Sequence, residues 1–214
     1  MTDETLPAPA AAAVAERPRF SIEFSARDLL NVAIFAVIFI VVTYAIGMLG
    51  IISPLTWLLA VPVSIIVNGI PFMLFLTRVK HAGMVTLFAA IVGLFYLLSG
   101  NTLVSTIAIV LLGILAELVL LAGRYRSRWA AIGAYTVFSL GFFSPFLPLL
   151  YDRQGYFGSA TWTQMGEDYI RASDELFSLP VLGLLALAIL IAGFLGGLLG
   201  SAVLRKHFVR AGLA

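Results

Sequence analysis

The sequence predicts an all-α, polytopic membrane protein with six transmembrane helices and both termini in the cytoplasm. Three observations predict this fold class. The 214 residues are 61% hydrophobic and 11% charged, whereas an average soluble domain is about 25% charged. The apolar residues gather into runs of about 20, the length that crosses the hydrocarbon core of a bilayer. The basic residues gather in short segments between those runs.

The first predicted element is an N-terminal tail. Residues 1–24 are rich in alanine and proline and contain no apolar segment long enough for a signal peptide, so we expect a disordered cytoplasmic tail. Ser25 and Asp28 then have the spacing of a helix N-cap and its third helical residue. The membrane domain, residues 25–214, is therefore expected to start here.

Six apolar segments follow within this domain. The second contains Pro62 and Pro71, and the fifth contains Pro145 and Pro148. Such prolines are tolerated in a membrane where neighbouring helices satisfy the freed carbonyl groups. The predicted spans are Leu29–Leu49, Leu55–Leu76, Ala82–Leu98, Thr102–Ala122, Trp129–Leu150 and Phe177–Leu204.

Lysine and arginine set the predicted orientation, because cytoplasmic loops carry an excess of both. Of the 13 lysines and arginines, only Arg153 and Arg171 lie in loops on one side of the membrane, both between the fifth and sixth spans. The others lie in the tail, in the loops after the second and fourth spans, and after the last span. We therefore expect a multi-pass protein of the cell membrane whose N and C termini are both cytoplasmic.

Motifs for catalysis are missing from the sequence. It contains no GxxxxGK[ST] phosphate-binding loop and no cysteine, and its two histidines, His81 and His207, lie outside the predicted spans. A nucleophile–histidine pair or a histidine-ligated zinc site within the membrane is therefore excluded. We expect no enzyme activity, no catalytic residue, no metal site and no cofactor. The basic residues lie in short segments between the apolar runs, so nucleic-acid binding is not expected.

Two polar side chains lie inside predicted spans. Glu117 is near the cytoplasmic end of the fourth span, where we expect it to pair with Arg124 or with a neighbouring helix. Asn68, in the second span, is expected to hydrogen-bond a neighbouring helix. One acid within the spans is thin support for a proton- or ion-coupled carrier, which usually needs several such groups.

Small residues in the first and last spans indicate close contacts between helices. Gly193 and Gly197 have the GxxxG spacing that lets two helix backbones approach each other. Ala33 and Ala36 form a narrow face on the first span. Each pair fits either packing within the chain or docking to another membrane subunit.

Four long stretches carry a resemblance to a known family. They are GIPFMLFLTRVKHAGMVTL (69–87), LAGRYRS (121–127), FSLGFFSPFLPLLYDRQGYF (138–157) and GGLLGSAVLRKHFVRAGLA (196–214). With six spans and no site for ATP, they resemble the MptD (Trep_Strep) family of S components of energy-coupling factor (ECF) transporters. The resemblance covers the chain from Asp28 to its C-terminal residue.

The resemblance implies the substrate-binding subunit of an importer. An S component captures a vitamin-sized or other micronutrient from outside and docks onto a membrane T component, which carries two cytoplasmic ATPases. S components often dock through an AxxxA motif on their first helix. Here Ala33 is followed by Ala36 and Val37, so that motif is not matched. Docking is therefore expected through Ala33 and Ala36, or through Gly193 and Gly197.

Two other functions stay open. A standalone secondary carrier predicts coupling groups near the membrane midplane and internal repeats, neither of which the spans show clearly. A non-transporting membrane assembly protein predicts no affinity for a small molecule.

The loop between the fifth and sixth spans is expected to be an external cap over a ligand cavity. Residues 151–176 hold five of the chain's 11 acidic residues and are far longer than a plain connection between helices. Glu167 and Arg171 are expected to pair along a short amphipathic helix. The alternative is a solvated loop with its aromatic residues at the lipid headgroups. The expected substrate-binding residues of the cap and the neighbouring loops are Trp57, Asn101, Tyr151, Asp152, Arg153, Tyr156 and Trp162.

Overall fold

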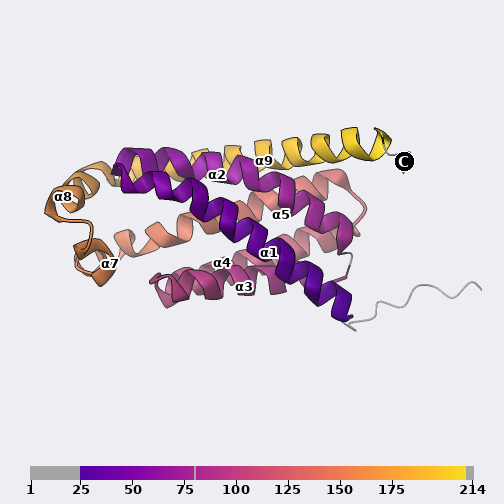
Figure 1. Ribbon diagram of the computed structural model, residues 1–214, viewed down its shortest axis with the longest axis horizontal. Coiled ribbons are helices and arrows are strands. Elements are labelled where there is room, and N and C mark those ends of the chain that lie inside the picture. The colour runs from indigo at the N-terminus through magenta and orange to yellow at the C-terminus, as the bar shows by residue number, and fades with distance from the viewer. Residues whose placement is uncertain (1–24, 80, 211–214) are drawn as a thin grey trace, which may run out of the picture.

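A bundle of long helices, covered at one end by three short ones, makes up the fold (Figure 1). The computed structural model describes residues 25–79 and 81–210, and within these ranges all regular secondary structure is helical. The predicted tail, residues 1–24, lies outside the described residues, as do Lys80 and residues 211–214. The described part of the chain contains 5 helical segments long and apolar enough to cross a membrane, together with a shorter apolar helix, α3.

The long helices coincide with the predicted spans to within a few residues. In the first span an α-helix continues into a short 3-10 helix, η1, and in the fifth into a longer one, η2. The elements are α1 (Ala26–Gly47), η1 (Met48–Ile51), α2 (Pro54–Arg78), α3 (Met84–Leu98), α4 (Leu103–Ala122), α5 (Arg128–Ser139), η2 (Leu140–Leu150), α6 (Arg153–Phe157), α7 (Ala160–Thr163), α8 (Glu167–Leu176) and α9 (Leu179–Arg210).

Local capping explains where the first helix starts. The backbone N–H of Asp28 donates to Ser25 Oγ at 3.2 Å, and the N–H of Ser25 donates to the Asp28 carboxylate at 3.3 Å. This reciprocal pair satisfies two N–H groups that a helix start otherwise leaves unbonded. The predicted capping box at Ser25 is therefore confirmed.

The change from α5 to η2 follows from its prolines. Pro145 and Pro148 have no backbone N–H, and a proline ring clashes with the carbonyl group four residues before it in an α-helix. The α-helix ends at Ser139, and the chain continues as η2 to Leu150. The Ser105 hydroxyl donates to the carbonyl oxygen of Ser144 at 2.7 Å, which ties η2 to α4.

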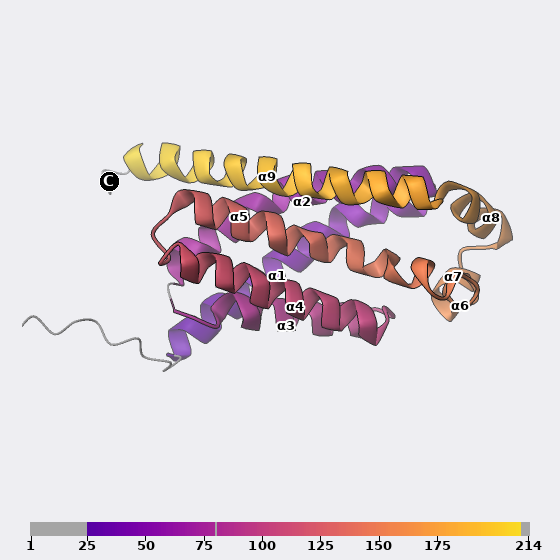
Figure 2. The ribbon, with the colours of Figure 1, turned by 180° about the vertical axis from the view of Figure 1, so that it is seen from behind.

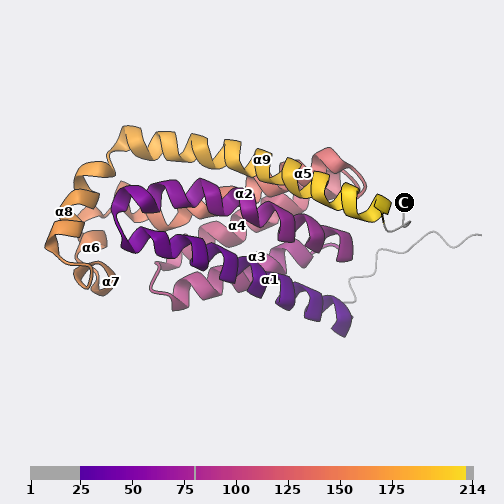
Figure 3. The ribbon, with the colours of Figure 1, turned by 45° about the horizontal axis from the view of Figure 1, so that its top comes forward.

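Glycines bring α9 into close contact with α2. A Cβ added at Gly69 would lie 2.1 Å from the carbonyl oxygen of Gly196, and one added at Gly200 would lie 2.3 Å from the carbonyl oxygen of Gly69. The two backbones therefore touch without intervening side chains. Figures 2 and 3 show α9 running along both α2 and α5.

Phenylalanine rings fill the centre of the bundle. The rings of Phe72 and Phe138 stack with centroids 5.2 Å apart, and those of Phe75 and Phe88 with centroids 5.0 Å apart. Phe39 of α1 contacts Phe88 edge to face at 5.4 Å. Offset and edge-to-face arrangements are those that aromatic rings prefer. This cluster joins α1, α2, α3 and α5.

The two polar side chains within the spans both bond neighbouring helices. The Asn68 amide donates to Thr43 Oγ1 of α1 at 2.9 Å, as predicted. The carboxylate of Glu117 accepts hydrogen bonds from the backbone N–H groups of Val85 and Thr86, at 2.8 Å and 3.0 Å, where α3 begins. A negative group is favoured at this end of a helix.

Glu117 does not pair with Arg124, so that part of the expectation is wrong. Arg124 and Tyr125 adopt φ angles of 50° and 53°, in the left-handed region. This turn brings the Tyr125 hydroxyl onto the Glu117 carboxylate, to which it donates a hydrogen bond. Arg124 is left exposed.

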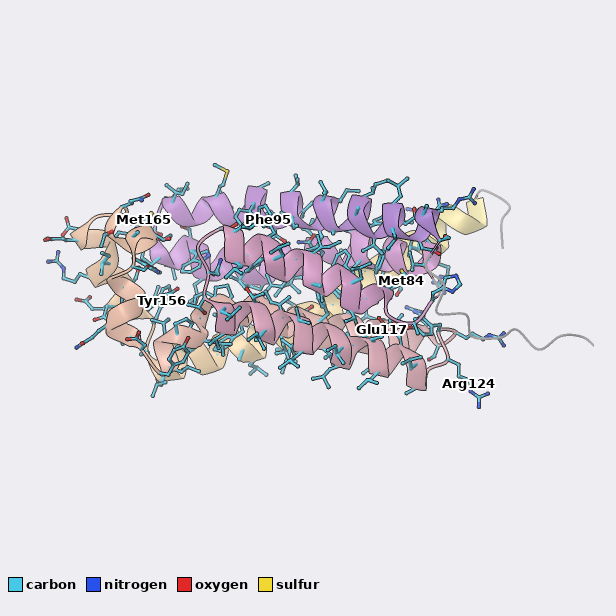
Figure 4. The ribbon with its side chains drawn as sticks, turned by 90° about the horizontal axis from the view of Figure 1, so that it is seen from below. Met84, Phe95, Glu117, Arg124, Tyr156 and Met165 are labelled. Carbon is cyan, nitrogen blue, oxygen red and sulfur yellow. The ribbon has the colours of Figure 1, made fainter. Side chains whose placement is uncertain are left out.

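The two ends of the bundle differ in composition. Residue 25 and the end of α9 lie at one end, and α6–α8 cover the other, which we call the cap end (Figures 1 and 2). Figure 4 places Arg124 with Glu117 and Met84 at the end opposite the cap. We call that end the basic end; the lysines and arginines there whose side chains the structure describes are Arg27, Arg78, Arg124, Arg126, Arg128, Arg205 and Lys206.

Candidate functional site

A cavity of about 370 Å³ opens at the cap end. Its sides are formed by the junction of α1 and α2, by the turn between α3 and α4 and by the prolines of η2, and residues 151–169 cover it. Figure 4 shows Tyr156 and Met165, which both line it, at this end of the bundle. The volume lies within the range of about 300–1,000 Å³ that is usual for small-molecule sites.

The covering segment folds into α6, α7 and α8. Asp152 caps α6 by accepting a hydrogen bond from the backbone N–H of Gly155 at 2.9 Å. Gly166 has a φ of 88° and makes the turn into α8, a conformation that glycine adopts without steric cost. Residues 151–176 are therefore an ordered cap rather than an irregular loop.

Helix α8 is amphipathic, but its ion pair differs from the predicted one. Arg171 pairs with Asp168, three residues before it, at 2.7 Å and not with Glu167. Both side chains of the observed pair are highly exposed, so the pair contributes little to stability.

Two sets of hydrogen bonds fasten the cap to the bundle. The Tyr169 hydroxyl donates to the carbonyl oxygen of Gly50 at 2.6 Å, which joins α8 to the α1–α2 junction. Arg153 Nε donates to Asp174 Oδ1 at 2.5 Å, and its Nη1 donates to the carbonyl oxygen of Phe177 at 2.8 Å. The Arg153 guanidinium therefore links the start of the cap to its end.

Aromatic side chains form one wall of the cavity. Trp162 is 7% exposed, and its ring centroid lies 5.1 Å from that of Tyr156, 5.9 Å from that of Trp57 and 6.0 Å from that of Tyr169. Trp57 in turn stacks on Phe146 of η2 at 4.7 Å. The cap and the helices below it thus share one aromatic cluster, which presents apolar faces to a ligand.

The turn between α3 and α4 forms a polar wall. The Asn101 amide donates to the carbonyl oxygen of Tyr96 at 3.1 Å. Thr102 Oγ1 and Ser105 Oγ are 2.9 Å apart. These bonds fix the turn, and Asn101, Thr102 and Ser105 all line the cavity.

Burial affects the acidity of two tyrosines of the cap, Tyr156 and Tyr169. Removal from water disfavours a phenolate, so burial raises the pKa of Tyr156 above its usual value, and it likewise raises the pKa of Tyr169. Both hydroxyls therefore remain protonated near neutral pH.

The structure brings most of the predicted binding residues together. Trp57, Asn101, Tyr151, Asp152, Tyr156 and Trp162 line the cavity. Arg153 does not line it, because its guanidinium bonds the end of the cap instead.

Some lining residues were missed. Ser105 and Pro145 belong to predicted membrane spans, and nothing in the sequence indicated that these positions face a cavity.

The predicted docking residues have different surroundings. On α1, Ala33 is exposed but Ala36 is completely buried. On α9, Gly193 and Gly197 are buried, and a Cβ added at either would lie 2.8 Å from Ser139 Oγ or 3.1 Å from an Ile132 methyl group. In this arrangement Ala36 and the glycine pair contact other parts of the same chain, and Ala33 alone faces outward.

Comparison with known proteins identifies the family. No curated protein and no solved structure matches the chain. Residues 26–210 match the family described as "Hypothetical bacterial integral membrane protein (Trep_Strep)". This range includes all the helices of the bundle and the cap. The chain therefore belongs to the Trep_Strep family of bacterial integral membrane proteins.

Proposed function

We propose that the chain is the substrate-binding S component of an ECF importer. The observation that carries the proposal is the capped cavity at the end of the bundle opposite the basic end. Its volume suits a vitamin-sized ligand, and it joins an apolar aromatic wall to a polar turn, the usual composition of a small-molecule site. The resemblance of the sequence to S components supports the same function.

The proposed orientation follows from the basic residues. Lysine and arginine are enriched on the cytoplasmic side of membrane proteins, so the basic end faces the cytoplasm and the cap faces outside. The cavity then collects its ligand from the external medium. A T component and two ATPases supply the energy for release inside, because the sequence has no phosphate-binding loop of its own.

Two other functions are less well supported. A proton- or ion-coupled carrier needs titratable groups along its path, whereas Glu117 bonds the first N–H groups of α3, away from the cavity, and is the only acid or base buried in a span of the described chain. A membrane assembly protein has no need of a lined cavity of this size.

The test compares ligand binding with subunit assembly. A thermal-shift screen of the purified protein against vitamins, tetrapyrroles and metal chelates identifies a ligand, because a bound ligand stabilises the folded state. Trp162→Ala and Tyr156→Ala should each lower the affinity for that ligand by tenfold or more, which corresponds to about 1.4 kcal/mol. Assembly with the T component should be retained in both variants. Trp129→Ala is the matched control, since Trp129 is 64% exposed and lies near the basic end.

Two results would contradict the proposal. One is uptake by the chain alone in proteoliposomes at the rate of the complete complex. The other is failure to assemble with any T component of the same cell. Unchanged affinity in both cap variants would move the binding site away from the cavity.

A further inference from the structure

The charge around the cavity is one-sided. Among the described residues that line it, Asp152 is the only aspartate, glutamate, histidine, lysine or arginine. Arg153 follows it in the chain but is engaged with Asp174 and with the carbonyl oxygen of Phe177. An anionic ligand would therefore enter without a cationic partner, which is costly away from water.

Two acceptor atoms of residues that line the cavity are unused among the described residues. Asp152 Oδ1 accepts the N–H of Gly155, while Asp152 Oδ2 bonds none of the described residues. Asn101 uses its amide nitrogen on Tyr96, which leaves its Oδ1 free to accept a hydrogen bond. The Ser105 hydroxyl donates to the carbonyl oxygen of Ser144. Unused acceptors suit a ligand that brings its own N–H groups or positive charge.

The aromatic wall favours the same kind of ligand. Trp57, Tyr156, Trp162 and Tyr169 all line the cavity, and Trp162 lies within 6.0 Å of each of the other three. A cation over the face of tryptophan or tyrosine is attracted by the ring, more strongly when water is excluded. Clustered aromatic side chains and a carboxylate that line one cavity are a suitable environment for an ammonium group.

We infer that the cavity takes an organic cation, a ligand with a positively charged nitrogen on an apolar or aromatic body. The inference rests on the proposed function, because it names the substrate class of the same cavity. The cap as a whole adds to the effect. Residues 151–176 contain five of the 11 acidic residues of the chain and two arginines, Arg153 and Arg171, both paired with acids. The resulting negative field draws cations toward the entrance.

The experiment compares three small probe molecules that share a phenyl ring and differ in charge. Binding of benzyltrimethylammonium, benzyl alcohol and benzoate to the purified full-length protein is measured by calorimetry and by thermal shift. The cation should bind at least tenfold more tightly than the alcohol, and benzoate should bind more weakly than either. Asp152→Asn should remove most of the preference for the cation, with little effect on the alcohol.

The variant is chosen to keep the cap folded. Asparagine caps helices about as well as aspartate, so Asp152→Asn preserves the start of α6 and removes only the charge. Asp168→Asn is the matched control, since Asp168 is an exposed acid of α8 that does not line the cavity. It should leave the cation preference unchanged.

Three results would overturn the inference: benzoate binding as tightly as the cation, an undiminished preference in Asp152→Asn, or no binding of the cation to the folded protein. Different results test the proposed S-component function. An anionic cargo that binds in this cavity and is weakened by Trp162→Ala would overturn the charge assignment and leave the S-component function standing. Failure to assemble with a T component would overturn that function whatever the charge series shows.

Discussion

Replacement of Gly69 by alanine tests the closest helix contact in the bundle. The added Cβ would lie 2.1 Å from the carbonyl oxygen of Gly196 and 2.3 Å from its carbonyl carbon. Both atoms belong to the backbone of α9, so no side chain can rotate away to make room. Relief of the clash requires α2 and α9 to separate.

The magnitude follows from this geometry. The distance between the added Cβ and the carbonyl oxygen of Gly196 has to grow by about 1.3 Å, from 2.1 Å to the 3.4 Å at which ordinary van der Waals contact begins. Overpacking of a well-packed interior typically costs about 1–3 kcal/mol, and a backbone obstacle places Gly69→Ala at the upper end. Alanine in a helix gains about 1 kcal/mol over glycine. The expected net loss is therefore about 2 kcal/mol.

The assay is thermal unfolding of the purified protein in detergent. A loss of about 2 kcal/mol should lower Tm by roughly 4–8 °C in a chain of this size. The matched control is Gly183→Ala on α9, where an added Cβ meets nothing within 4 Å. It carries the same gain in helix propensity without the clash and should leave Tm unchanged or raised. Equal Tm values for the two variants would refute the proposed contact between α2 and α9.

Three further predictions concern the basic end, the cap and the topology. Glu117→Ala should lower the free energy of unfolding by about 3 kcal/mol, because it leaves the N–H groups of Val85 and Thr86 unbonded at about 1–3 kcal/mol each. Chemical unfolding should show a smaller loss for Glu117→Gln and none for the exposed Glu175→Ala. An unchanged free energy of unfolding in Glu117→Ala would contradict the assigned hydrogen bonds. Tyr169→Phe should accelerate hydrogen exchange of residues 167–176 by about fivefold, since it removes one hydrogen bond of about 1 kcal/mol to Gly50. The control is Tyr44→Phe, which should leave this exchange unchanged because the Tyr44 hydroxyl bonds no described residue. Equal exchange rates in the two variants would show that other contacts hold α8. In cysteine labelling of intact cells, Ser127→Cys should react only from the cytoplasm and Ser159→Cys only from outside, and reaction of both from one side would remove a span or reverse the orientation.

The membrane helices were predictable because bilayer length and hydropathy determine them with little help from tertiary structure. The start of α1 was predictable because Ser25 and Asp28 bond each other locally. The partner of Glu117 was not fully predictable. It depends on the left-handed φ angles of Arg124 and Tyr125, which non-glycine residues seldom adopt and which a sequence pattern does not reveal.

The residues of the candidate site likewise include some that were predictable from the sequence and some that were not. Trp162 and Tyr156 could be predicted because aromatic residues in a long loop between apolar spans stand out from their surroundings. Arg153 was expected at the ligand for the same reason, yet its partners, Asp174 and Phe177, lie 21 and 24 residues further along the chain. Ser105 lines the cavity from a membrane helix. Only the folded arrangement of α4 against η2 brings it there.

The uneven charge of the two ends connects topology with ligand choice. A loop that is to be external has to be poor in lysine and arginine, whereas aspartate and glutamate contribute little to orientation. Acids can therefore accumulate in the cap without opposing the fold, and residues 151–176 hold five of the 11 in the chain. The two arginines present there are both engaged, Arg153 with Asp174 and Arg171 with Asp168. The scarcity of basic residues on which the proposed orientation rests also leaves Asp152 as the only charged group at the cavity wall of the described chain. The proposed orientation and the proposed cation preference therefore have a common origin in the composition of the cap.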